Sequence, residues 1–432
     1  MSDEVALTMY SRRVIEALRS GVPNRDAVQA MGCNQDMVEQ LFDQKLEQVS
    51  EHLAVGEQVA GLLVSGGYGT GKSHLLEYLE SSALAERFVC SRIVISKETP
   101  LYDAGKLFRA AVESAIVPSR TGQTLQEVAH RLRRFRDTDD YARFRQWCNS
   151  AKSSISTLFP ASLFLHERLE NDPELVEAII NFWSGEPLGS GDRLSMKKVR
   201  DALKIVDGAS LFQLNAVPAR QLPFERFRFT AQMIAGAGYR GWVILLDEIE
   251  LIGRYSFLQR AKSYAELARW MGLLPDDRYP GILTVASISD DFVPAVLEKI
   301  GGKDDFGSLR VKLESRGTEQ DRIVAERAEA GMQIIRRSAI DLKPPSKETV
   351  EQAYHRLKEF HARAYEWKPP DIARAEPSSL TRMRKLVRRW INEWDLKRLY
   401  PETPFSIEEQ QLSPSYAEDI ELEAAPEGTD EA

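Results

Sequence analysis

The sequence predicts an α/β protein whose core is a parallel sheet covered by helices. Short apolar runs of strand length alternate with segments of helical periodicity, first at residues 60–65 and 92–95 and again at 242–246 and 282–288. This alternation is typical of βαβ units. Helical patterns dominate the rest of the chain, so we expect several helical segments around a smaller sheet.

Changes in this pattern divide the chain into five expected segments. Apolar strands and glycine-containing loops mark the core, whereas helical periodicity without strands marks the parts beside it. Carboxylates and prolines without any Lys or Arg mark the C-terminal tail, which we expect to be disordered. The segments are an N-terminal helical segment (1–55), the core (56–117 and 236–320), a mostly helical insertion (118–235), a C-terminal helical part (321–400) and the acidic tail (401–432).

The composition is that of a globular protein without disulfides or a structural metal. Three cysteines, Cys33, Cys90 and Cys148, lie far apart and form no metal-ligand spacing. No apolar stretch is long enough to span a membrane, and the N-terminal residues lack the apolar core of a signal peptide. We therefore expect a reduced, cytoplasmic protein. The net charge of −8 comes from the tail, which holds ten carboxylates, so the body of the protein does not exclude a nucleic-acid partner.

A glycine-rich stretch follows the first apolar strand. It reads GGYGTGKS and fits G-x-x-x-x-G-K-[ST], the Walker A loop that wraps the phosphates of a nucleoside triphosphate such as ATP. Glycines bring backbone N–H groups close to phosphate oxygens, and the lysine supplies a positive charge for the β- and γ-phosphates. An ordinary glycine-rich turn is the alternative, which the strand before the loop and the helix after it disfavour. The residues expected to bind the nucleotide are Gly66, Gly67, Tyr68, Gly69, Thr70, Gly71, Lys72, Ser73 and His74.

The apolar run 242–246 ends in two carboxylates, Asp247 and Glu248. A strand that is apolar on both faces suits the centre of a parallel sheet and delivers such residues to its carboxyl edge. We expect Asp247 and Ser73 to hold Mg²⁺, and Glu248 to orient or deprotonate the attacking water. A buried strand followed by a helix-capping Asp is the alternative. Together with the loop and Lys72, the pair predicts a Mg²⁺-dependent ATPase.

The strand at 282–288 runs into a polar end. In multi-stranded nucleoside triphosphatases the strand beside the phosphate loop offers a polar side chain to the γ-phosphate or to the water. Ser289 is the first candidate for this catalytic role and Ser287 the second. A polar strand end or a helix cap accounts equally well for both serines.

Five further stretches carry a resemblance to a known family. The sequence resembles the ATP-binding proteins of BREX phage-defence systems, the BrxC/BrxD P-loop family, over roughly residues 12 to 390, and its size fits the BrxD-like members. The combination of stretches with their spacings is much more specific than the phosphate loop alone. The stretches are LRSGVP at 18–23, YGTGKSHLL at 68–76, FWSGE at 182–186, GYRG at 238–241 leading into LDEIE at 246–250, and RAKSY at 260–264.

The resemblance implies an AAA+-like ATPase with a helical lid after the core. It implies ATP and Mg²⁺ as cofactors, other defence-system proteins and double-stranded DNA as partners, and assembly as a homo-oligomer, with no membrane role. The lid would bring an arginine to the γ-phosphate, and either Arg382 or Arg384 fits that role. An arginine acting across subunits is also implied; Arg310 and Arg316 lie in the expected region, and no motif chooses between them.

Two alternatives to a working ATPase stay open. One is a nucleotide-gated assembly switch that binds ATP and hardly turns over, and the other is an initiator-type DNA loader. The cluster Arg131, Arg133, Arg134 and Arg136 could neutralise phosphates, with Phe135 stacking on a base, or it could be a solvated helix face beside acidic residues. The acidic tail is either a solvated terminus or a competitor of DNA for basic surfaces.

The C-terminal helix carries an apolar stripe at helical spacing. We expect this stripe to be core packing of the lid rather than a partner groove. Its residues are Leu380, Met383, Val387, Trp390 and Trp394.

Overall fold

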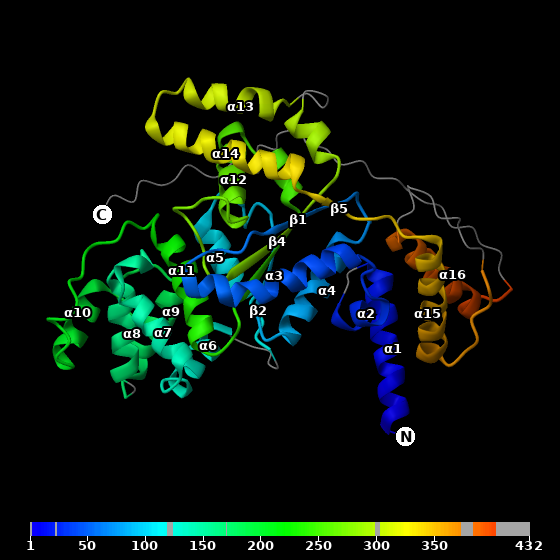
Figure 1. Ribbon diagram of the computed structural model, residues 1–432. Coiled ribbons are helices and arrows are strands. Elements are labelled where there is room, and N and C mark those ends of the chain that lie inside the picture. The colour runs from blue at the N-terminus through cyan, green and yellow to red at the C-terminus, as the bar shows by residue number, and fades with distance from the viewer. Residues whose placement is uncertain are drawn as a thin grey trace.

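The computed structural model describes residues 2–21, 24–118, 124–169, 171–298, 303–372 and 383–402. Its centre is a five-stranded sheet in which every neighbouring pair is parallel, with the strand order β2-β3-β4-β1-β5 (Figure 1). The predicted α/β class with a parallel sheet is therefore confirmed. The strands are β1 (Leu62–Ser65), β2 (Val89–Val94), β3 (Trp242–Asp247), β4 (Ile282–Ile288) and β5 (Ile340–Asp341).

Helices cover both faces of the sheet, which is why β3 and β4 are buried along their whole length. On one face, strand residues such as Val243 and Leu245 join a core with α3 and α4, and on the other face Ile244 and Leu246 join a core with α5, α11 and α12. The helices are α3 (Asp36–Val55), α4 (Lys72–Ala85), α5 (Ala104–Glu113), α11 (Leu222–Gly236) and α12 (Phe257–Trp270).

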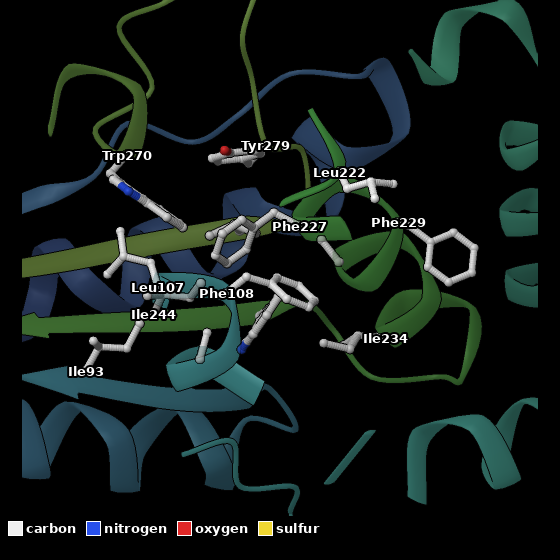
Figure 2. Packing of buried hydrophobic residues seen from close by; sticks show 14 of the residues in the cluster. Ile93, Leu107, Phe108, Leu222, Phe227, Phe229, Ile234, Ile244, Trp270 and Tyr279 are labelled. Atoms are coloured by element: carbon white, nitrogen blue, oxygen red, sulfur yellow. The ribbon is translucent and has the colours of Figure 1, made fainter. Parts of the chain in front are cut away.

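An aromatic group fills the second core. Figure 2 shows Phe227 of α11 among Phe108, Trp270 and Tyr279, with ring centroids 4.9, 4.8 and 5.5 Å from its own. Edge-to-face pairs of this kind add to the stabilisation from burial alone. This packing holds α11 and α12 against β3 and β4. The ends of these two strands, at Asp247 and before Ser289, are therefore fixed in position.

Among the described residues, five α-helices lie between α5 and α11, in the range expected to be a helical insertion. In α6, Arg131 stacks on Phe135 and Tyr239 at 4.6 Å each and donates to the carbonyl oxygen of Ala237 at 2.6 Å. The ring of Phe135 lies against Gly238, where a Cβ atom would be only 2.3 Å away. Phe135 is therefore half-buried and engaged by Arg131 and Gly238, which disfavours its role as a base-stacking platform. The elements are α6 (Thr124–Arg134), α7 (Asp139–Cys148), η1 (Ala151–Ser153), α8 (Leu158–Arg168), α9 (Pro173–Trp183) and α10 (Met196–Ile205).

The helices from the two ends of the chain pack together beside the sheet (Figure 1). Val387, Trp390 and Trp394 are buried there, which confirms core packing for these three residues of the apolar stripe. Met383 is half-buried against the same core, and Leu380 lies outside the described residues. An ion pair of 2.7 Å joins Arg19 to Asp395 across this cluster. We call it the terminal helix cluster, and it consists of α1 (Ser2–Ser20), α2 (Arg25–Met31), α15 (Lys347–Tyr365) and α16 (Met383–Leu399).

The segment between β4 and the terminal helix cluster stays with the core. Here α13 (Asp305–Glu314) and α14 (Glu319–Arg337) pack on each other and α14 packs on α12, before β5 adds an edge strand (Figure 1). Two short helices complete the described chain, η2 (Ile249–Arg254) after β3 and η3 (Val293–Leu297) after β4.

Besides Leu380, two further sequence expectations fall on residues that the structure does not describe. Arg382 is one of them, and the acidic tail from residue 403 onward is the other. Within the described residues, no helix combines the length and apolarity needed to cross a membrane.

Candidate functional site

The glycine-rich loop joins β1 to α4 in a conformation that demands glycine. Gly69 and Gly71 have φ values of +80° and +108°, in the region that side-chain-bearing residues rarely adopt. A Cβ atom on Gly66 would lie 2.7 Å from the hydroxyl oxygen of Thr70. The spacing of these glycines in the sequence is therefore explained by the backbone path of the loop.

The N-terminus of α4 is an open anion-binding end. The helix begins at Lys72, directly after Gly71, and no side chain caps it. Its first turn therefore presents backbone N–H groups and the positive end of the helix dipole, which favour a phosphate. Ser73 and His74 lie in this turn, and His74 Nε2 is 2.8 Å from the carbonyl oxygen of Gly32.

Lys72 is held by two groups of the protein. Its Nζ donates to the carbonyl oxygen of Gly66 at 2.6 Å and lies 3.8 Å from Oε1 of Glu250. Burial raises the pKa of Glu250, although the positive charge of Lys72 opposes that shift. The sequence patterns predicted no role for Glu250, although it is the third carboxylate of the LDEIE stretch.

Asp247, at the end of β3, accepts hydrogen bonds on both carboxylate oxygens. Ser287 donates to Oδ1 at 2.6 Å, and Arg92 donates to Oδ2 at 2.9 Å. Burial alone would raise the pKa of Asp247, but the hydrogen bonds from Ser287, Arg92 and Ser73 and the charge of Arg92 outweigh it and hold the pKa below its ordinary value. Asp247 is therefore a carboxylate with a fixed orientation and a full negative charge.

Glu248 has a different environment from its neighbour. It is exposed, and its backbone has a φ of +60°, a conformation uncommon outside glycine that turns the chain sharply after β3. Partial burial and the negative charge of Asp247 raise the pKa of Glu248, while Lys72, Arg384 and Arg92 oppose the shift. A carboxylate with a raised pKa is the better proton acceptor of the two.

The order of the strands explains why these groups meet. β4 lies between β1 and β3, with Ser65 of β1 paired to Ile288 and Leu246 of β3 paired to Ala286. All three strands end at the same edge, where the loop, Asp247 and Ser289 follow them. The Ser289 hydroxyl donates to Asp291, while the buried Ser287 hydroxyl is engaged by Asp247.

A cavity of about 140 Å³ opens beside the glycine-rich loop. It lies between that loop, the segment Gly32–Gln35 and the terminal helix cluster. Hydrogen bonds connect this segment to α4 and to the chain after β5. His74 of α4 contacts the carbonyl oxygen of Gly32, and the Gln35 amide both donates to and accepts from the backbone of Lys343 at 3.1 Å. No sequence motif marked this cavity, since its walls come from three distant parts of the chain.

Arg384 reaches this region from α16. Its guanidinium carbon lies 5.5 Å from the ring centroid of Tyr68 in the loop, and its side chain lines the cavity. Arg310 instead pairs with Glu314 and Glu329 at 2.8 and 2.6 Å, on the α13–α14 hairpin. Arg316 pairs with Asp321 at 3.2 Å at the turn of the same hairpin.

The residues present fit a nucleoside triphosphate with Mg²⁺. The bare loop and the uncapped helix suit phosphates, and the Ser73 hydroxyl and Asp247 carboxylate are the hard oxygen ligands that Mg²⁺ prefers. Within the part of the chain that the structure describes, no group of three or more His, Cys, Asp or Glu side chains forms a metal site of its own. A Mg²⁺ ion at Ser73 and Asp247 would complete its coordination with waters and with the phosphate oxygens of the nucleotide.

The sequence matches the family described as BREX system ATP-binding protein BrxC/D. The match covers residues 8–134 and 221–390, which include the loop, both carboxylates, Arg384 and the walls of the cavity. It leaves out residues 135–220, which hold helices α7 to α10. None of the curated proteins matches the chain. The match spans more than half of the sequence, and the chain therefore belongs to the BREX ATP-binding BrxC/D family.

Proposed function

We propose that this protein binds ATP with Mg²⁺ at the edge of its sheet and hydrolyses it as an AAA+-like ATPase in phage defence. The observation that carries the proposal is the strand order, which puts the ends of β1, β4 and β3 side by side. The phosphate loop, the γ-phosphate neighbour Ser289 and the carboxylates Asp247 and Glu248 then meet at one edge. Membership of the family supports nucleotide binding and a place in a multi-protein defence system.

Each group has a proposed task that follows from its charge and position. The backbone of the loop and Lys72 bind the β- and γ-phosphates. To reach them, the Lys72 ammonium group gives up its contacts with Gly66 and Glu250 and contacts phosphate oxygens instead. Ser73 and Asp247 hold Mg²⁺, which neutralises phosphate charge. Glu248 orients the attacking water and takes up its proton, a task suited to its raised pKa.

The cavity beside the loop suits the nucleoside part of ATP. It adjoins Gly69 to Gly71 and has apolar walls, including Met31 and Val387, together with polar groups such as Gln352. Arg384 lines the same cavity and is also close enough to Glu248 for its charge to oppose the rise in the pKa of that carboxyl. In this proposal the terminal helix cluster is the lid and Arg384 is its γ-phosphate contact. The proposal extends to assembly of several copies and to action on double-stranded DNA or other defence proteins.

One observation favours a second function, a nucleotide-gated switch with little turnover. Lys72, which would bind the phosphates of ATP, is paired with Glu250, and Asp247, which would bind Mg²⁺, is paired with Arg92. Such pairs stabilise a nucleotide-free state, which a switch requires. ATP turnover by the purified protein, with and without Mg²⁺ and duplex DNA, separates the two: sustained turnover supports the ATPase, and stoichiometric binding without turnover supports the switch.

A further inference from the structure

Arg92 at the end of β2 lies between two carboxylates from different elements. Its two terminal nitrogens donate at 2.9 Å to Glu77 Oε2 on α4 and at 2.9 Å to Asp247 Oδ2 on β3. Only 22% of the Arg92 side chain is exposed. Glu77 is four residues after Ser73 on α4, so both lie on the same helix face. The guanidinium therefore lies directly beside the two residues that suit a metal.

The contacts of Asp247 show what the guanidinium does there. Each carboxylate oxygen can accept about two hydrogen bonds, and Arg92 and Ser287 engage Oδ2 and Oδ1 respectively. A charge-assisted bond to one oxygen and a hydroxyl bond to the other fix the rotation of the carboxylate. The backbone N–H of Glu248 also donates to Oδ1, at 3.1 Å, and the Ser73 hydroxyl is in hydrogen-bond contact with the carboxylate. A cation shared by Asp247 and Ser73 would therefore replace the hydrogen bond between these two residues.

A positive charge beside a metal ligand would by itself repel Mg²⁺. Here Glu77 balances Arg92, because the same guanidinium donates to both carboxylates. The Arg92–Glu77 pair is neutral as a unit, so the charge of Asp247 stays available to a cation. Arg92 can then orient the carboxylate without cancelling its charge.

We propose that Arg92 is a positioning residue for magnesium, holding the Asp247 carboxylate in the orientation in which it and Ser73 take the ion that accompanies the nucleotide. This inference rests on the proposed nucleotide site. Loss of a partner that orients a metal ligand typically weakens metal affinity 10- to 100-fold. The Arg92 guanidinium contacts Glu77 and Asp247, whereas Lys72 of the glycine-rich loop contacts Gly66 and Glu250, so nucleotide binding without the metal should change little in an Arg92 variant.

Equilibrium binding of a fluorescent ATP analogue to the full chain tests the role without using activity. In Arg92→Met, the Mg²⁺ concentration that gives half of the metal-dependent gain in affinity should rise by roughly 10- to 100-fold. The dissociation constant in EDTA should change less than about threefold. Arg92→Lys keeps the positive charge but has a single donor nitrogen in place of the guanidinium fork. Its Mg²⁺ requirement should lie between those of the wild type and Arg92→Met. Arg240→Met is the matched control, because Arg240 pairs with Glu86 near the opposite end of β3.

The direction of the change in Arg92→Met separates orientation from charge, and Glu77→Gln supplies a comparison. If Arg92 acted only as a repelling charge, Arg92→Met would lower the Mg²⁺ requirement and Glu77→Gln would raise it. If it positions Asp247, both substitutions raise it. An unchanged or lower requirement in Arg92→Met overturns the proposal. Should Arg92→Met fail to fold, Arg92→Lys decides, because a requirement equal to that of the wild type then overturns it.

The same titration keeps this inference apart from the proposed function. Failure of the wild-type protein to bind the analogue contradicts the nucleotide site itself. The wild type could instead show Mg²⁺-dependent binding with the same Mg²⁺ requirement in Arg92→Met and Arg92→Lys. That result contradicts only the role of Arg92.

Discussion

Lys72 and Glu250 form an ion pair in which Nζ lies 3.8 Å from Oε1. The lysine comes from the first turn of α4 and the glutamate from the short helix after β3, so the pair links the phosphate loop to the carboxylate edge of the sheet. The Glu250 carboxylate thus lies beside the Lys72 ammonium group, which is the positive charge that the glycine-rich loop offers to phosphates. ATP must share Lys72 with this carboxylate or displace it.

Glu250→Gln should therefore bind ATP more tightly than the wild type. Removing a competing negative charge beside Lys72 should lower the dissociation constant for ATP in EDTA by roughly threefold to tenfold. Titration of a fluorescent ATP analogue measures this change. Glu314→Gln, which removes an exposed carboxylate on α13, is the control. Weaker ATP binding by Glu250→Gln would instead mean that Glu250 holds Lys72 in its binding position.

Arg384→Met should lose discrimination between ATP and ADP. A guanidinium that contacts the γ-phosphate makes a charge-assisted bond that ADP cannot form. The dissociation constant for ATP should rise by roughly tenfold, and that for ADP by less than about threefold. Competition titrations with both nucleotides measure the two constants.

The control for this prediction lies one turn further along the same helix. Arg388 is exposed on α16 and is not among the residues that line the cavity. Arg388→Met should leave both dissociation constants unchanged. Equal losses for ATP and ADP in Arg384→Met would assign Arg384 to the nucleoside or the inner phosphates instead.

Glu266 on α12 should make stability depend on pH. Burial raises its pKa to about 7, although the charge of Arg269 opposes that shift. Between the ordinary pKa of a Glu and about 7, the folded protein keeps the proton and the unfolded chain loses it, so stability falls as pH rises through this window. The loss approaches about 3 kcal/mol above the folded pKa.

Thermal unfolding of the wild type and Glu266→Gln at pH 5 and pH 8 measures this dependence. Gln resembles the neutral Glu, so the variant should gain several degrees relative to the wild type on going from pH 5 to pH 8. The difference in unfolding temperature between Glu266→Gln and the wild type could also be the same at both pH values. That result would show that Glu266 is ionised in the folded protein at pH 5 as well.

The parts of the site that the sequence predicted are those encoded by short local patterns. Lys72 and Ser73 belong to one loop motif, and Asp247 and Glu248 follow one apolar strand, so their placement at the sheet edge follows from βαβ topology. Arg92 carries no such pattern, and the LDEIE stretch that contains Glu250 does not show that it pairs with Lys72. These contacts arise only when β2, β3 and α4 come together.

The fold shows the same division. Four strands were visible as apolar runs, whereas β5 has two residues, too few to show any periodicity. The contact of α1 with α15 and α16 joins segments more than 300 residues apart, which no local pattern reports. The cavity beside the glycine-rich loop depends on that contact and was therefore not predicted.

Hydrolysis by the wild type and Glu248→Gln at saturating ATP and Mg²⁺ tests the central claim most directly. The account predicts turnover by the wild type that requires Mg²⁺, together with ATP binding by Glu248→Gln within about threefold of the wild type. It also predicts that Glu248→Gln hydrolyses ATP slower by a factor of roughly 10² or more. Turnover by Glu248→Gln at the wild-type rate, or no turnover by the wild type with or without duplex DNA, would contradict it.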